Sequence, residues 1–160
     1  MKGLVADMKE MQTGILLQTH ITDLMVPADN VAIVQAENSL EHALLVLIKT
    51  GYSSIPVLDK HSHVCGTVSK TLILDSILGL ERIEFERLSD HHVEEVMNRK
   101  VARTKGAETF FRALELSINQ PFICVEDEQG VFQGIMTRKA ILALVYHYFR
   151  DLSGPPHKAT

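Results

Sequence analysis

The stretch IPVLDKHSHVCGTVSK at residues 55–70 decides the fold of this chain. It consists of an apolar run that ends at Asp59, a polar turn, and a second apolar run through Gly66. Two short apolar runs around a polar turn predict a β-hairpin. The stretch ICVEDEQGVFQGIMTR at residues 123–138 repeats the pattern at an offset of 68 residues. The sequence therefore predicts the same hairpin twice.

The sequence before each hairpin is repeated as well. Ala43-Leu44 is matched by Ala113-Leu114 at an offset of 70 residues, and Leu24-Met25 is matched by Val96-Met97 at an offset of 72. The offset drifts by only four residues across the whole unit. Such a constant offset indicates a duplicated unit, not chance similarity.

Both copies have the same predicted order of elements: a β-prone stretch, an amphipathic helix, the two hairpin strands and a final helix. The first copy places them at residues 31–34, 39–48, 55–68 and 71–78, and the second copy at residues 101–104, 108–118, 122–136 and 138–149. Ser39 is placed to cap the first helix, and Gly51 to end it in the left-handed conformation. The order β-α-β-β-α, found twice, predicts an α+β fold with a small mixed sheet in each copy.

The copies also set the expected domain boundaries. We expect unit 1 at residues 20–78 and unit 2 at residues 93–150, joined by a charged, helix-prone linker at residues 79–92. Residues 1–19 are expected to form a helical cap, and residues 151–160 a flexible tail. A unit of about 55 residues buries too little surface to be stable alone, so the two units must pack together.

The composition excludes several classes of protein. Hydrophobic residues make up 46% and charged residues 22% of the 160 residues, which excludes a disordered or fibrous chain. The net charge of −4 argues against a nucleic-acid partner. The longest apolar runs are far shorter than the roughly 18 residues that cross a bilayer. With no secretory signal and two distant cysteines, Cys65 and Cys124, we expect a cytoplasmic protein that binds no membrane.

The duplicated unit resembles a tandem pair of CBS domains, also called a Bateman module. The likeness is carried by the apolar-Pro-Val strand, the hairpin, and the step from Gly through two apolar residues to Ser or Thr at the start of a helix. It covers about residues 20–150. Residues 39–59, the linker at 79–86 and residues 126–138 are more narrowly similar to the stand-alone cyclic-di-AMP-binding protein B family of Firmicutes.

This resemblance implies a function. It implies a non-catalytic sensor, a disc-shaped homodimer, that binds cyclic di-AMP and controls other proteins according to whether the ligand is bound. Reported partners of the family are a Rel-type (p)ppGpp synthetase/hydrolase and pyruvate carboxylase. An AMP- or ATP-sensing module and a ligand-free structural interaction module remain the alternatives.

The resemblance places the ligand in a cleft between the two units, and the residues there suit adenine. An adenine base needs an apolar slot and hydrogen bonds to its edge. Ala32 is small enough for a base to lie against it, and Tyr52 can stack on a base. The residues expected at this end of the cleft are Asn30, Val31, Ala32, Tyr52, Ser53, Ile55 and Pro56.

The phosphate end of the ligand is expected at Thr137-Arg138-Lys139, where the last helix begins. A helix N-terminus attracts anions because its backbone N–H groups are free and its dipole is positive there. Arg138 can form a bidentate pair with a phosphate, and Lys139 adds a point charge. Ser69-Lys70 is the weaker counterpart in the first unit. Asn30 and Lys139 depart from the family, where a basic residue and a second arginine are common.

Positions 72 and 140 bear on the choice of ligand. CBS units that bind AMP or ATP commonly have an Asp three residues after the Ser or Thr, where it accepts hydrogen bonds from the ribose hydroxyls. Here those positions are Leu72 and Ala140. In a cyclic dinucleotide the 3′ oxygen is esterified, so a carboxylate would lose one donor and face an anion. The absence of the Asp therefore favours cyclic di-AMP.

Metal-binding and catalytic patterns are weak. His61, His63 and Cys65 alternate along the first hairpin and share one face, but a hairpin tip is usually solvated. The chain lacks the G-x-S-x-G, P-loop, H-E-x-x-H and Gly-rich dinucleotide motifs. We therefore expect neither a metal, nor a cofactor, nor enzymatic activity.

Overall fold

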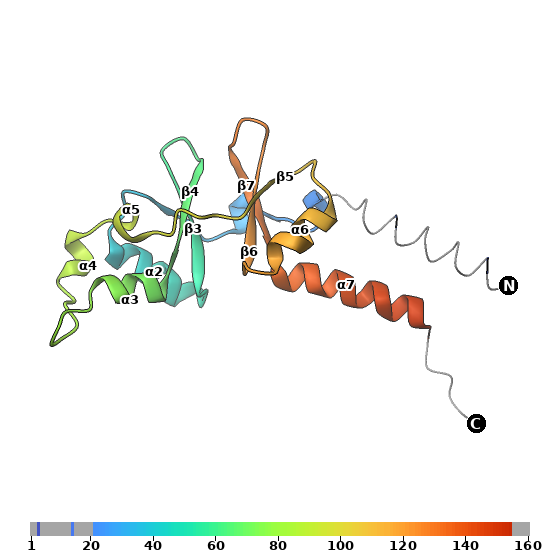
Figure 1. The fold of residues 1–160 in the computed structure, drawn as a ribbon. Helices are drawn as coiled ribbons and strands as arrows, with labels where there is room; N and C mark the ends of the chain where they lie inside the picture. The colour runs from blue at the N-terminus through green and yellow to red at the C-terminus, as the bar shows by residue number, and fades with distance from the viewer. Residues whose placement is uncertain (1–2, 4–13, 15–20, 155–160) are drawn as a thin grey trace, which may run out of the picture.

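Two hairpins of the same design lie side by side at the centre of the chain (Figure 1). The first is formed by β3 (Ser54–Leu58) and β4 (Val64–Ser69), and the second by β6 (Phe122–Glu126) and β7 (Phe132–Thr137). The structure is a computed structural model that describes residues 3, 14 and 21–154. The predicted helical cap, apart from two single residues, and the tail from residue 155 onward lie outside the described residues.

The helices just before and after the hairpin of unit 1 lie on one side of the two hairpins, and those just before and after the hairpin of unit 2 lie on the other (Figure 1). α2 (Leu40–Thr50) begins after Ser39, whose hydroxyl accepts a hydrogen bond from the backbone N–H of His42. It ends at Gly51, which has a φ of 75°, so both predicted caps are confirmed. α3 (Lys70–Ser76) follows directly on β4.

Unit 2 repeats this arrangement. α6 (Phe110–Ser117) precedes the hairpin, and α7 (Arg138–Ser153) follows it. The hydroxyl of Thr137 caps α7 by accepting a hydrogen bond from the backbone N–H of Ala140. α7 includes the first three residues of the predicted tail, 151–153.

The sheets are mixed, as predicted. One has the order β2-β3-β4 and the other the order β1-β7-β6-β5. β2 (Val34–Gln35) runs parallel to β3, β5 (Arg103–Lys105) runs parallel to β6, and the other pairs are antiparallel. β2 begins later than the predicted residues 31–34, and the short 3₁₀ helix η2 (Ala28–Asn30) comes just before Val31.

Each unit completes its sheet with a segment from the start of the other repeat. β1 (Val26–Pro27) pairs with β7 in unit 2, and Asn98 forms a β-bridge with Thr67 on β4 in unit 1. Gly134 and Gly66 make room for these segments: a Cβ atom would lie 2.1 Å from the Val26 carbonyl oxygen at the first and 2.6 Å from the Met97 sulfur at the second. The sequence repeat did not predict this exchange.

The linker contains less helix than predicted. Residues 79–86 form turns and bends, and within the linker only α4 (Arg87–Asp90) is helical, while α5 (Val93–Val96) follows just after it. The prediction of a helix over the first part of the linker is wrong, because the chain reverses there. The backbone N–H of Glu84 returns to the carbonyl of Ile77, at 2.7 Å.

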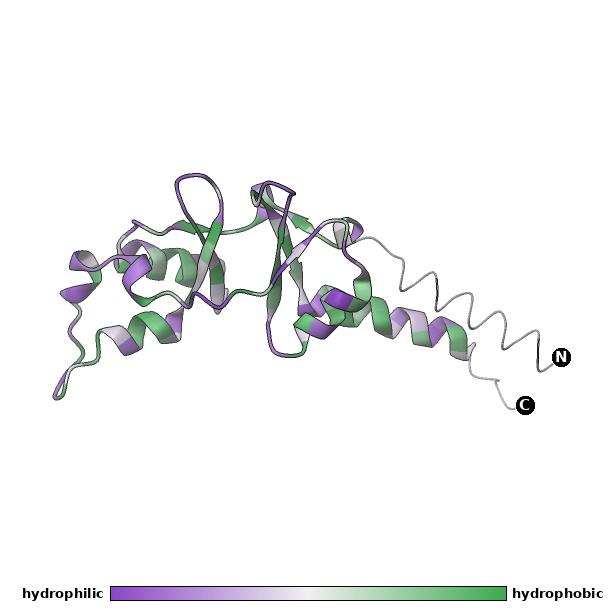
Figure 2. Cartoon of the chain, turned by 45° about the horizontal axis from the view of Figure 1, so that its top comes forward, coloured by the Kyte–Doolittle hydropathy of each residue, from purple (hydrophilic) through white to green (hydrophobic). Residues whose placement is uncertain are grey.

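The two units share a hydrophobic core. One buried cluster lies in each unit, and a third, made of Leu58, Val64, Cys124 and Phe132, joins them. The guanidinium of Arg103 also links the units, since it donates to the Val64 carbonyl at 2.6 Å and to the Glu126 carboxylate at 2.9 Å. Figure 2 shows that the two hairpin loops are mainly hydrophilic. No helix within the described part of the chain is long and apolar enough to span a bilayer.

Candidate functional site

A cavity of about 200 Å³ opens between the two units. Unit 2 contributes Pro121, Phe122, Ile135 and Thr137, and the rest of the wall comes from Val26, Asn30, Val31, Ala32, Tyr52, Ser53, Ser54, Ile55 and Pro56. Sites that bury a drug-sized ligand measure roughly 300–1,000 Å³. The cavity is therefore suited to hold one ring system of a larger ligand whose remainder lies outside.

The structure brings together eight of the residues predicted for the site. These are Asn30, Val31, Ala32, Tyr52, Ser53, Ile55, Pro56 and Thr137. Ile55 and Pro56 are buried on β3 and give the slot an apolar wall, whereas Tyr52 is half exposed at its rim. The polar groups of the lining side chains that a purine could meet are the amide of Asn30 and the hydroxyls of Tyr52, Ser53, Ser54 and Thr137.

Arg138 follows Thr137 but does not line the cavity. Its Nε donates to the carbonyl of Ser117, at 2.8 Å, at the end of α6. Its backbone N–H donates to the carbonyl of Pro121, at 2.9 Å, on the cavity wall. Among the described residues, the two terminal nitrogens of this guanidinium have no hydrogen-bond partner. Lys139 is exposed beside it.

The weaker pair, Ser69 and Lys70, also lies next to the wall and not in it. Ser69 pairs with Ser54 across the hairpin, and its hydroxyl caps α3 by accepting from the backbone N–H of Leu72. The backbone N–H of Lys70 donates to the carbonyl of Ser53 at 3.3 Å. Each unit thus places a cation one residue beyond a hydroxyl at the edge of the same cavity.

Five of the lining residues were not predicted. Ser54 lies inside the predicted segment, and Pro121 and Phe122 stand 68 residues after Ser53 and Ser54, so the repeat itself could have indicated them. Val26 and Ile135 reach the cavity because they are paired between β1 and β7. That pairing follows from the exchange of segments between units, for which the sequence carries no local signal.

A second cavity, of about 370 Å³, lies in unit 2 beside Val101 and Ala102. These two residues stand 70 positions after Val31 and Ala32. The walls of the second cavity include Arg112 and Glu115, which form an ion pair at 2.6 Å. The cavities beside these equivalent positions of the two units therefore differ in chemistry, and the cavity beside Val31 and Ala32 offers the apolar slot.

The remaining reactive groups do not converge. Within residues 21–154 no three His, Cys, Asp or Glu side chains are close enough together to hold a metal ion. Burial raises the pKa of the Cys124 thiol to about 12, so this sulfur stays protonated near neutral pH. Burial also raises the pKa of Cys65.

Comparison with known proteins agrees with this geometry. The CBS domain family matches residues 21–79. Over 146 residues the chain is 43% identical to cyclic di-AMP receptor B of Bacillus subtilis, a match that covers 91% of this chain and 99% of the relative. The chain belongs to this family of CBS-domain proteins.

Solved structures of related CBS proteins extend the match to both units. A CBS domain-containing protein of unknown function from Bacillus anthracis is 50% identical with a TM-score of 0.79, covering 84% of this chain and 98% of its own. The CbpB protein of Listeria monocytogenes in complex with c-di-AMP is 47% identical with a TM-score of 0.75, covering 81% and 97%. The predicted resemblance and the tandem CBS fold are confirmed.

Proposed function

We propose that this chain is a non-catalytic receptor for cyclic di-AMP that regulates partner proteins according to ligand occupancy. The observation that carries the proposal is the apolar cavity between the two CBS units, with a hydroxyl and a cation from each unit at its edge. It is supported by the Bacillus subtilis relative, which is named as a cyclic di-AMP receptor, and by the Listeria monocytogenes relative, solved with c-di-AMP.

One adenine of the ligand would occupy the slot between Ala32 and the buried Ile55-Pro56 segment, with Tyr52 at the rim. The cavity is too small for the whole ligand, so the phosphodiester ring would lie at its mouth. Thr137 lines the cavity, and Arg138 is the next residue in the chain. Because the Nε of Arg138 is held on the Ser117 carbonyl, its two terminal nitrogens are the donors left for a phosphate.

The first turns of α3 and α7 favour this ligand over AMP or ATP. Leu72 and Ala140 occupy the positions where a ribose-binding carboxylate would stand, and their backbone N–H groups are used to cap the helices. Neither side chain can accept a hydrogen bond from a ribose hydroxyl.

The role proposed is binding, without catalysis or cofactor. Cys124 cannot act as a thiolate nucleophile while burial holds its pKa near 12. Both cysteines are free thiols, which agrees with the reducing cytoplasm as the place where the protein acts. By family resemblance, the regulated partners are a Rel-type (p)ppGpp synthetase/hydrolase and pyruvate carboxylase.

We further propose that two copies form a disc-shaped homodimer. Large apolar side chains are exposed on the helices of both units: Leu45, Ile48 and Leu74 on α2 and α3, and Phe111, Leu142, Tyr146 and Phe149 on α6 and α7. A second copy of the chain would cover them. Sedimentation of the wild type and of Leu142→Glu checks this: the wild type should be a dimer, and a monomeric wild type would contradict it.

Calorimetric titration of the purified chain with cyclic di-AMP, AMP and ATP tests the ligand. We expect cyclic di-AMP to bind most tightly and Arg138→Met to weaken it at least about tenfold, a loss of about 1.4 kcal/mol. The matched control is Arg150→Met, because Arg150 is exposed at the far end of α7 and pairs only with Asp151 among the described residues. Tighter binding of AMP or ATP would overturn the choice of ligand, and no binding of any nucleotide would favour the structural interaction module.

A further inference from the structure

Three large apolar side chains gather on residues 79–86, a segment that we call the linker turn. Leu80 has a relative exposure of 107%, and Phe85 and Ile83 are also exposed. Burying a side chain of this kind in an apolar environment is favourable, and Leu80 gains none of this among the described residues. Leu88, which is only three residues after Phe85, packs against the core of unit 1. The apolar side chains of the linker turn are thus left outside a core that the neighbouring leucine reaches.

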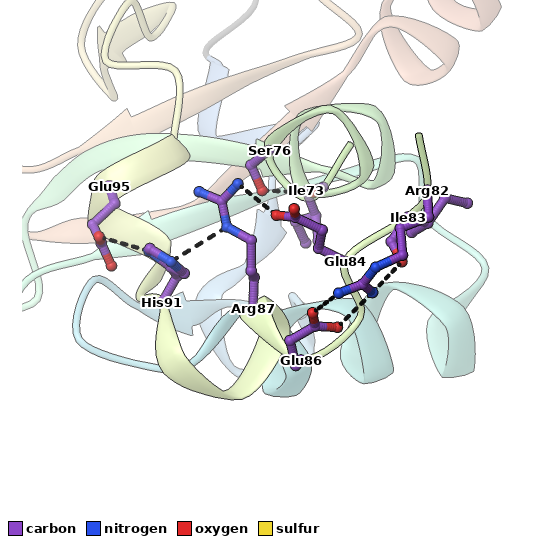
Figure 3. A network of polar contacts seen from close by, with 9 residues as sticks. All are labelled: Ile73, Ser76, Arg82, Ile83, Glu84, Glu86, Arg87, His91 and Glu95. Carbon is purple, nitrogen blue, oxygen red and sulfur yellow. Dashed lines mark hydrogen bonds and ion pairs between the residues drawn. The ribbon is translucent and has the colours of Figure 1, made fainter. Parts of the chain in front are cut away.

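The linker turn is held in place by a network of polar contacts (Figure 3). The backbone N–H of Gly79 donates to the carbonyl of Arg82 at 2.9 Å, and the side chain of Arg82 pairs with Glu86. Arg87 pairs with Glu84 at 3.3 Å. A segment fixed in this way loses little conformational freedom when a partner binds, which favours recognition.

The same network extends to the base of the linker turn. The Nε of Arg87 donates to His91 at 3.5 Å, and the other ring nitrogen of His91 lies 3.0 Å from the carboxylate of Glu95 (Figure 3). This connects the linker turn through α4 to the start of α5. The turn is therefore anchored at both ends: by Ile77, the residue that follows α3, and by Glu95 on α5.

The charges around the apolar side chains are mainly negative. Residues 79–86 contain three glutamates and one arginine. That arginine, Arg82, is engaged by Glu86, and no ion pair of Glu81 is found among the described residues. Glu84 and Glu86 are already paired with Arg87 and Arg82, so in a symmetric pair of linker turns the Glu81 carboxylate of each copy would add an uncompensated like charge, which is unfavourable. A surface rimmed with lysine or arginine is the complementary one.

We propose that the linker turn docks a partner protein, with Leu80 and Phe85 entering an apolar pocket that is rimmed by basic side chains. This docking surface is separate from the ligand-binding cavity. The proposal depends on the proposed function in one respect only, namely that the chain has a partner protein to regulate. α3 connects the two sites, because it begins at Ser69-Lys70 beside the cavity and ends where the linker turn starts. Occupancy of the cavity and of the linker turn would thus act on the two ends of one short helix.

Site-specific photocrosslinking of the full chain tests the proposal. In cells that naturally produce the chain, the photoreactive residue p-benzoylphenylalanine replaces Leu80. In a separate control variant it replaces Gln129, which is exposed on the hairpin loop of unit 2. We expect a crosslinked adduct with a partner protein only from position 80. Mass spectrometry identifies the crosslinked residue of the partner, and we expect this residue to lie in an apolar pocket beside lysines or arginines. Adding Glu81→Lys should lower the yield of the adduct at least about fivefold, and the matched Glu128→Lys should not.

The other outcomes overturn the proposal. These are no adduct, an adduct with a second copy of the chain, an equal adduct from position 129, a crosslinked residue outside such a pocket, or a yield that Glu81→Lys does not lower. Calorimetry with cyclic di-AMP on the same variant separates this proposal from the proposed function. Ligand binding without the adduct would refute the docking surface alone, and the adduct without ligand binding would refute the ligand alone.

Discussion

Gly134 on β7 lies directly against the backbone of Val26 on β1, with no room for a side chain between them. Because Val26 lies near the start of the first repeat and Gly134 belongs to the second, this contact holds the first strand of unit 1 on the sheet of unit 2. Val26 also lines the cavity between the units. The glycine therefore connects the stability of the sheet to the shape of the site.

Gly134→Ala should destabilise the chain by about 1–3 kcal/mol, the usual cost of forcing extra volume into a packed site. Its Cβ atom would stand 2.1 Å from a backbone oxygen, so β1 must leave the sheet edge. The free energy of unfolding in urea measures the loss. Gly106→Ala is the control, since its nearest neighbour is the end of the Thr22 side chain at 3.1 Å, and a change within about 0.5 kcal/mol is expected there. Equal losses in the two variants would show that the close approach is not the cause.

Arg103→Met should cost about 1–3 kcal/mol, because it leaves the Val64 carbonyl and the largely buried Glu126 carboxylate without their shared donor. The substitution keeps an apolar stem of similar length, so packing is little changed. Arg112→Met removes an exposed ion pair with Glu115 and should cost only about 0–1 kcal/mol. Urea unfolding of both variants makes the comparison. A loss for Arg103→Met no larger than that of the control would mean that this link between the units adds nothing.

Ala32→Leu should fill the slot proposed for adenine and weaken cyclic di-AMP binding by about tenfold or more, equivalent to about 1.4 kcal/mol. The added atoms would occupy a cavity of only about 200 Å³. Ala107→Leu, at an exposed turn position, is the matched control. Calorimetry measures both affinities, and thermal unfolding checks that each variant is folded. Unchanged affinity in the folded Ala32→Leu variant would place the base elsewhere.

Acid should weaken the contacts that Glu95 on α5 makes with the end of the linker. Its pKa lies below the ordinary value because the carboxylate accepts a hydrogen bond from the backbone N–H of His92, and further from the His91 side chain. A carboxyl group with a lowered pKa stabilises the folded chain above its unfolded pKa, and the contribution is lost as the pH falls through the folded pKa. Glu95→Gln should therefore melt at a lower temperature than the wild type at pH 7, and the difference should shrink as the pH falls below the ordinary pKa of the carboxyl group.

The control for this pH dependence is Glu128→Gln, which removes an exposed carboxylate that is paired with Lys105 at 3.0 Å. It should change the melting temperature little at either pH. A difference between Glu95→Gln and the wild type that persists undiminished at pH 3 would count against the carboxylate as its source.

The hairpins and helices were predictable because their signals are local. Ser39 and Gly51 mark the ends of α2 by chemistry that acts within one turn, and the structure has both caps where the sequence predicts them. The conformation of the linker was not predictable in the same way, because the helix propensities on which that prediction rested amount to only tenths of a kcal/mol per residue. The backbone bonds that return Glu84 to Ile77 outweigh them.

The site was predictable to the extent that it follows the repeat. Ala32 and Pro56 lie in segments whose pattern could be read directly, and both line the cavity. Val26 could not be identified, because its place is set by a strand of two residues that pairs with the far end of the chain. The contact of Arg138 with Ser117 was equally hidden, since it joins groups on two separate helices. Its predicted role at the phosphate stays a prediction.

The exchange of edge segments between the two halves also bears on how this architecture arose. A lone ancestral copy, with its opening segment unable to reach its own sheet, would have found the missing edge only on an identical neighbour. The present chain then corresponds to such a pair fused end to end, and for that reason an isolated half is expected to self-associate and not to persist as a monomer.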